Sequence, residues 1–185
     1  MLELYTDRLR LRSVVASDWD NFLYIHSSEK LNKYVRKPQA ESVIRQKFER
    51  IIKPNELAED DTLLLLIEDV HQQLFVGFIS LHNISEALGQ LEVGYMLHTQ
   101  AHGNGYASEA LAALVDWVCL AHKPHKLIAH CAKDNIASTK VLGKSGFIQE
   151  GLLRQNWKVG DTWLDERLYG LLISERVKSV QVDSQ

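Results

Sequence analysis

The residues best placed to do chemistry form a short glycine loop between a strand-like segment at 91–97 and a long apolar helical segment. Gly103 and Gly105 are separated by one residue, so the backbone can turn tightly and approach a ligand without a Cβ in the way. The first amides of the following helix have no partner inside the helix, and its dipole is positive at that end. The loop therefore predicts a site for a phosphate or pyrophosphate.

Three nucleotide-binding patterns compete for this loop. The phosphate-binding loop of ATPases requires Gly-Lys followed by Ser or Thr, whereas Gly105 is followed by Tyr106. A dinucleotide fingerprint requires a third Gly or Ala at the position of Ser108, and an acidic residue about 20 residues later, where residues 123–126 are Lys-Pro-His-Lys. The third pattern, Gln/Arg-x-x-Gly-x-Gly/Ala, is matched by Gln100 and the two glycines. The loop therefore resembles the acyl-coenzyme A (CoA) loop of the GNAT acetyltransferases. A nicotinamide or flavin enzyme is disfavoured.

The resemblance extends beyond the loop. Residues 135–147 are similar to the family's next helix, with an Asn-x-x-Ser start and a Gly-Phe end. Residues 6–12 resemble the first strand of the branch that includes the ribosomal-protein acetyltransferases RimJ and RimL. The last two strands of that branch resemble the segments that contain Glu150-Gly151, Asp165 and Tyr169. An ordinary glycine-rich turn would explain the loop alone, but two motifs in the right order favour the family over residues 6–173.

The periodicity of apolar residues predicts a mixed α/β chain in the order β-α-α-β-β-β-α-β-α-β-β. Strands are expected at 8–12, 62–67, 74–81, 91–97, 126–131, 147–157 and 162–173, and helices at 19–25, 39–53, 104–122 and from 135. The resemblance implies the GNAT fold, with a mixed central sheet of about seven strands and about four helices. We expect one acetyltransferase domain over residues 1–185, with its core at about 6–173 and a polar tail from Ser174.

Composition limits the possible functions. The 185 residues are 45% hydrophobic and 24% charged, which suits one globular domain. No apolar run approaches the ~20 residues of a membrane span, and the first residues do not resemble a signal peptide, so we expect a cytoplasmic protein without a membrane partner. The net charge of −3 argues against direct nucleic-acid binding. The two cysteines have no metal-ligand spacing, and His98 and His102 lack a third ligand, so no metal is expected. Monomer and homodimer both remain open.

The resemblance implies that acetyl-CoA is the cosubstrate and lies where the strand at 92–97 separates from the strand at 127–131. The backbone of Met96, Leu97 and His98 would hold the pantetheine arm, and an amide near Met96 or Leu97 would polarise the thioester carbonyl. Asn135 would bond to the arm or cap its own helix. The residues expected around the pyrophosphate are Gln100, His102, Gly103, Asn104, Gly105, Tyr106 and Ala107.

Two side chains are candidates for proton transfer. Glu92 is an acid among apolar strand residues, and many family members have a glutamate there, so we expect it to accept the amine proton directly or through a water. The alternative is a structural ion pair with Lys126. Ser138 is the candidate hydrogen-bond donor to the leaving thiolate, because the position of a tyrosine found in several branches is occupied here by Val141 or Leu142. A local bond from Ser138 to the helix backbone is the alternative.

These features predict an N-acetyltransferase that moves an acetyl group from acetyl-CoA to a primary amine by direct attack. The acceptor would be a protein N-terminal α-amine or a small-molecule amine, because the fold alone does not choose between them. A non-catalytic module that binds or senses acyl-CoA is the alternative from another functional class.

Overall fold

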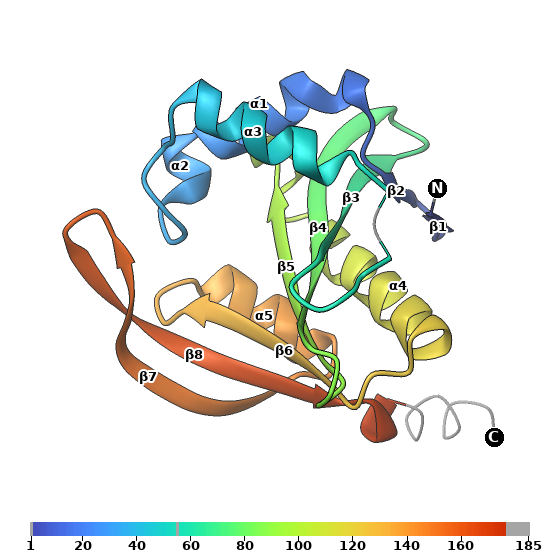
Figure 1. Cartoon of the computed structure of the whole chain (residues 1–185), viewed down its shortest axis with the longest axis vertical. Helices are drawn as coiled ribbons and strands as arrows, with labels where there is room; N and C mark the ends of the chain where they lie inside the picture. Colours follow the sequence, from blue (N-terminus) through green and yellow to red (C-terminus); the bar gives the residue numbers. More distant parts are fainter. Residues whose placement is uncertain (1, 55, 177–185) are drawn as a thin grey trace.

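The computed structural model describes residues 2–54 and 56–176, which form one mixed eight-stranded sheet in the order β1-β2-β3-β4-β5-β6-β8-β7 (Figure 1). Every neighbouring pair is antiparallel except β5 and β6, which are parallel. The strands are β1 (Glu3–Tyr5), β2 (Leu9–Ser13), β3 (Thr62–Asp69), β4 (Leu74–Ser85), β5 (Gln90–Leu97), β6 (Lys126–Ala132), β7 (Ile148–Val159) and β8 (Thr162–Leu172). The α-helices of the described residues are α1 (Trp19–Ser27), α2 (Glu29–Asn32), α3 (Glu41–Ile51), α4 (Tyr106–Ala121) and α5 (Ile136–Lys144).

The mixed α/β order is confirmed, with two short elements that the sequence did not indicate. Strand β1 has three residues and helix α2 has four, and neither is long enough to show a period. Two 3-10 helices, η1 (Ala16–Asp18) and η2 (Thr99–Ala101), precede longer helices. Residues 177–185 of the expected polar tail lie outside the described residues, while Arg176 pairs with Asp116 of α4 at 2.8 Å. Among the helices of the described residues, none has the length and apolarity to cross a membrane.

Two apolar layers cover the β2 to β5 half of the sheet, one on each face. On one face, Leu111 and Leu114 of α4 join Leu81 of β4 in the larger core cluster. On the other face, Phe22 of α1 and Phe48 of α3 pack with strand residues of a second cluster. Burial on both faces explains why β3 and β4 are nearly continuous apolar runs instead of alternating ones.

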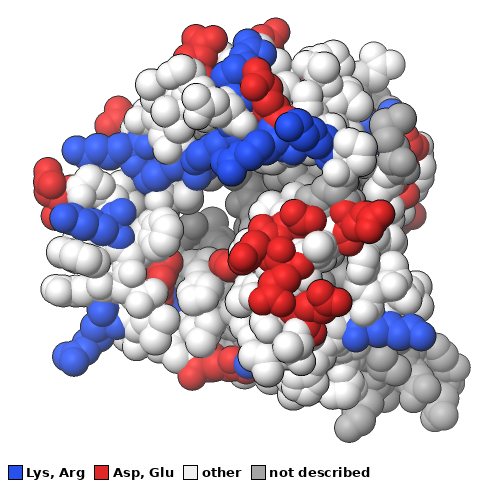
Figure 2. All heavy atoms as spheres, in the orientation of Figure 1, with Lys and Arg blue, Asp and Glu red and all other residues white. Residues whose placement is uncertain are grey.

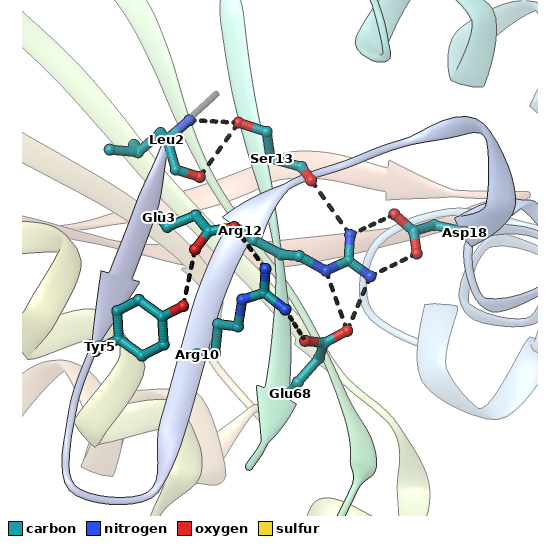
Figure 3. Close-up of polar contacts among 8 residues, drawn as sticks. All are labelled: Leu2, Glu3, Tyr5, Arg10, Arg12, Ser13, Asp18 and Glu68. Carbon is teal, nitrogen blue, oxygen red and sulfur yellow. Dashed lines mark hydrogen bonds and ion pairs between the residues drawn. The ribbon is translucent and has the colours of Figure 1, made fainter.

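An ion-pair network around Arg12 joins this half of the sheet to the start of α1 (Figure 3). Its guanidinium contacts Asp18 at 2.7 Å and Glu68 at 2.8 Å. Asp18 is only 4% exposed and also accepts the amide hydrogen of Val15 at 2.8 Å. The hydrogen bond to Asp18 is the main reason that the pKa of Arg12 lies above its usual value. The network fixes α1, and with it one wall of the site described below.

The sheet divides where β5 and β6 meet. Their pairing covers only three positions, from Gln90↔Lys126 to Glu92↔Ile128, although β5 continues to Leu97 and β6 to Ala132. Strand β6 instead pairs along its whole length with β8, and β5 with β4. The β1 to β5 half and the β6 to β8 half therefore diverge beyond Glu92, as the V between β5 and β6 in Figure 1 shows.

Candidate active site

A cavity of about 570 Å³ occupies the divergence of β5 and β6. Its walls come from β5, β6, the start of α5, the segment between α1 and α3, and the β7–β8 hairpin. Figure 2 shows the hollow between the lobe formed by α1 to α3 and the half of the molecule that contains β6 to β8. The candidate catalytic residues Glu92 and Ser138 both line the cavity.

The glycine loop has the conformation that its sequence predicts. Gly103 and Gly105 have φ values of +81° and +80°, in the left-handed region that residues with a Cβ rarely adopt. Gly105 is the N-cap of α4, and the first helical bond runs from the amide of Glu109 to its carbonyl at 3.2 Å. Within the described residues, no acceptor is found for the amides of residues 103–107. The loop therefore presents consecutive free N–H groups at the positive end of a helix of 16 residues.

Polar contacts hold this loop in place. The hydroxyl of Tyr106 donates to Asp69 at 2.6 Å, and Asp69 also accepts the amides of His71 and Gln72. The Tyr106 bond is the main reason that the pKa of Asp69 is lowered. The side chain of Tyr106 therefore anchors α4 to the β3–β4 turn, and only its amide is available to a ligand. Nε2 of His102 contacts the carbonyl of Leu97 at 3.1 Å, so the ring is tied to β5.

The pairing of β5 with β4 determines which backbone groups of β5 face the gap. In an antiparallel pair, alternate residues exchange backbone hydrogen bonds with the partner strand. The amide of His98 donates to the carbonyl oxygen of Val76 at 2.8 Å. Met96 is two residues before His98 and lies opposite Phe78, so it belongs to the same alternating set. Met96 and His98 therefore direct backbone groups toward β4, away from the gap in which the pantetheine arm is expected. Tyr95 and Leu97 direct theirs into the gap.

Ser138 lies against a tyrosine that the sequence analysis did not identify. The Tyr95 hydroxyl is 2.9 Å from Oγ of Ser138 and 3.3 Å from its carbonyl oxygen. Burial raises the pKa of Tyr95, so its hydroxyl stays protonated. Asn135 caps α5, because its side chain accepts the amide of Ser138 at 3.2 Å. The Tyr95–Ser138 contact required α5 to pack on β5, which no local sequence pattern reveals.

Glu92 occupies the opposite face of β5. Tyr95 packs against the core cluster under α4. Met96, whose side chain points to the same face of β5 as that of Glu92, packs against the α1–α3 cluster. Lys126, the possible structural partner, contacts Glu150 instead at 2.6 Å. Within the described residues the Glu92 carboxylate has neither an ion pair nor a hydrogen bond. It is therefore available to an incoming amine.

A second carboxylate on the same cavity wall also escaped the sequence analysis. Glu166 of β8 is 8% exposed and accepts a hydrogen bond from Asn156 at 2.7 Å. Nδ1 of His130 lies 3.7 Å away. Strand pairing places Ile128 beside Glu92 and Ala132 opposite Glu166, so the two carboxylates share one face of the sheet. The part of the chain that the structure describes contains no group of three His, Cys, Asp or Glu residues arranged for a metal.

Comparison with known proteins gives the family. A model described as the acetyltransferase (GNAT) domain matches residues 8–148. The chain belongs to the GNAT acetyltransferase family. The expected GNAT fold is confirmed, with eight strands instead of about seven. This GNAT protein is an acetyl-CoA-dependent N-acetyltransferase, as the sequence motifs predicted.

Relatives of this GNAT protein support the RimJ/RimL-like assignment. It is 28% identical over 178 residues to the N-acetyltransferase p20 of Bacillus licheniformis, across 95% of this chain and 98% of the relative. It is 32% identical over 101 residues to the ribosomal-protein-serine acetyltransferase of Escherichia coli, across 55% and 56% of the two chains. The spermidine N-acetyltransferase of Vibrio cholerae, solved with CoA and spermine, has a TM-score of 0.82 at 18% identity, across 93% of this chain and 99% of that one. This last likeness concerns the fold alone.

We predict that Gly105→Ala weakens acetyl-CoA binding in this GNAT protein. A Cβ at φ +80° costs about 1 to 2 kcal/mol and shifts the amides that follow it. Titration calorimetry measures the affinity, and urea denaturation measures the stability. Gly143→Ala is the matched control, because Gly143 lies inside α5, where an added methyl group meets open space and Ala favours the helix. Equal affinities for the two variants would contradict a ligand-binding role for the loop.

Proposed function

We propose that this enzyme acetylates an α-amino group by direct attack of the amine on acetyl-CoA bound between β5 and β6. The observation that supports this most strongly is the end of β5–β6 pairing at Glu92↔Ile128, beside a cavity that both strands line. A gap between two strands gives access from both faces of the sheet. Donor and acceptor can therefore approach from opposite sides and meet inside it.

In this proposal the donor lies on the α4–α5 face. The free amides of residues 103–107 bind the pyrophosphate, and the gap-facing backbone of Tyr95 pairs with the amides of the pantetheine arm. Since the carbonyl of Leu97 contacts His102, its amide is the group left to polarise the thioester carbonyl. Around this core, Gln100, His102, Asn104 and Asn135 form the rim of the donor site.

Glu92 acts as the general base in this proposal. Its carboxylate faces the acceptor side of the cavity and has no competing partner within the described residues. An ammonium group is attracted to the carboxylate, which then accepts a proton directly or through a water before the amine attacks. An α-amine, with a pKa of roughly 7.7 to 8.0, loses this proton far more readily than a lysine at roughly 10.4.

Tyr95 and Ser138 stabilise the leaving thiolate. Attack forms the new C–N bond, and collapse of the tetrahedral intermediate breaks the C–S bond, which leaves negative charge on sulfur. In this proposal the Tyr95 hydroxyl, 2.9 Å from Oγ of Ser138, donates to it and so leaves the serine hydrogen free to bond to the thiolate. This pair takes the place of the tyrosine that is absent at Val141 and Leu142.

The proposal also includes the class of amine that accepts the acetyl group. One relative is named for a ribosomal-protein serine and one structural neighbour for spermidine, so both a protein N-terminus and a small amine are represented. The pKa argument favours the N-terminal α-amine. A module that only binds acyl-CoA would release no CoA with any amine.

We expect Glu92→Gln to lower kcat/KM for an N-terminal peptide by at least tenfold at pH 7, and to recover partly near pH 9. The recovery follows because the amine loses its proton to solvent as the pH rises through its own pKa. CoA release measured from pH 6 to 10 tests this. A wild-type pH profile in the variant would remove Glu92 from the mechanism, and absence of CoA release by the wild-type protein with every amine would favour the binding module.

Removal of either hydroxyl of the thiolate-stabilising pair should lower kcat about tenfold, with little change in the KM for acetyl-CoA. Because the two groups act in series, Tyr95→Phe combined with Ser138→Ala should cost little more than the larger single change. Steady-state kinetics of the four proteins completes this cycle. Effects that multiply would show that the hydroxyls act separately, and an unchanged kcat would exclude both.

A further inference from the structure

The cavity contains an arginine that no carboxylate neutralises within the described residues. Arg36 lies between α2 and α3 and lines the cavity wall opposite β6. Its Nε donates to Oδ1 of Asn32 at 3.2 Å, and its Nη2 contacts Nδ1 of His26 at 2.8 Å. Asn32 is itself fully buried and donates to the carbonyls of Ile25 and Ser28. The guanidinium is therefore held in a fixed orientation by neutral groups.

The chemistry of these partners leaves the positive charge of Arg36 uncompensated. Burial, together with the nearby charges of Arg36 and Lys47, lowers the pKa of His26 to about 3, so the ring is neutral at pH 7 and accepts the hydrogen bond. Across residues 2–54 and 56–176, no carboxylate lies within ion-pair distance of Arg36. Its Nη1 has no hydrogen-bond partner there and remains accessible. A half-buried guanidinium with a free edge is suited to an anionic ligand.

The surroundings of Arg36 extend this positive character. Lys47 donates to Gln39 at 2.6 Å, and its pKa is lowered by burial and by the charges of Arg36 and Arg50. Figure 2 shows a band of Lys and Arg side chains over α2 and α3 along the border of the hollow. The carboxylates of Glu92 and Glu166 lie on the strand side of the same cavity. The cavity thus has an anionic side that suits an amine and a cationic side that suits a carboxylate.

We propose that Arg36 binds a carboxylate of the acceptor, so that the preferred acceptor carries a primary amine and a carboxylate in one molecule. This rests on the proposed function, since it assigns the acceptor of the same site. Two sources provide this chemistry: a free amino acid, and a peptide N-terminus followed by an acidic residue. A polyamine has no carboxylate and meets the cationic band with like charge, so it should be a poor acceptor.

Matched acceptor pairs test the role of Arg36. Serine is compared with serinamide, and a C-terminally amidated Ser-Asp peptide with its Ser-Asn counterpart, with spermidine as the carboxylate-free amine. Arg36→Gln should lower kcat/KM at least tenfold for the carboxylate member of one pair, and less than about twofold for its amide. A loss for serine but not serinamide identifies a free amino acid as the acceptor. A loss for the Ser-Asp peptide but not the Ser-Asn peptide identifies a peptide N-terminus followed by an acidic residue. Because wild type and variant are compared acceptor by acceptor, differences in amine pKa cancel.

Two further variants separate recognition from structure. Arg36→Lys keeps the charge but loses the planar fork, so it should retain part of the preference for the carboxylate. Lys37→Gln removes an exposed charge of the same segment and should leave the preference unchanged. The acetyl-CoA affinity of all variants should match that of wild type, because Arg36 lies on the acceptor side.

The outcomes distinguish this inference from the function on which it rests. Equal losses for the carboxylate and amide members, or a wild-type enzyme that prefers spermidine, would overturn the role of Arg36 alone. Failure of the wild-type protein to acetylate any of these amines, despite binding acetyl-CoA, would overturn the proposed function and this inference with it.

Discussion

The structure depends on the point at which β5 and β6 stop pairing. Backbone N–H and C=O groups inside a protein need partners, so two strands that separate leave a cost that something must offset. Here β5 stays fully paired with β4, and β6 with β8, so beyond Glu92 each of these strands is open on the edge that faces the other. Beyond Glu92, each half of the sheet therefore keeps its own strand pairing. The open edges remain available to a substrate that itself contains amide groups.

The same divergence explains why chemistry from both faces of the sheet meets in one cavity. Side chains alternate along β5, so Glu92 faces the α1–α3 side while Tyr95 faces α5. In an unbroken sheet, these two groups would lie on opposite faces, with the sheet between them. The gap lets both line one space, with the free amides of the glycine loop at the end of β5. The proposed base and the proposed thiolate-stabilising pair thus come from β5 and α5, and the proposed anion site from the start of α4.

The sequence predicted what depends on local patterns. The glycines at 103 and 105 require positive φ, and the structure has it, while the apolar periods located the main strands and helices. Contacts that depend on the tertiary fold could not be predicted from the sequence. Tyr95 meets Ser138 only because α5 lies against β5 in the fold, and Arg36 meets His26 only because the chain turns back after α2. The sequence also does not reveal which backbone groups of β5 face the gap, since strand register decides that.

We infer that acetyl-CoA binds in the gap between β5 and β6. Titration calorimetry of the purified protein with acetyl-CoA, with NADH and ATP at the same concentrations for comparison, tests it most directly. We expect one acetyl-CoA per chain, with a negative heat-capacity change from burial of the pantetheine arm and much weaker binding of the other two nucleotides. A folded sample that does not bind acetyl-CoA, or that binds NADH equally well, would contradict it.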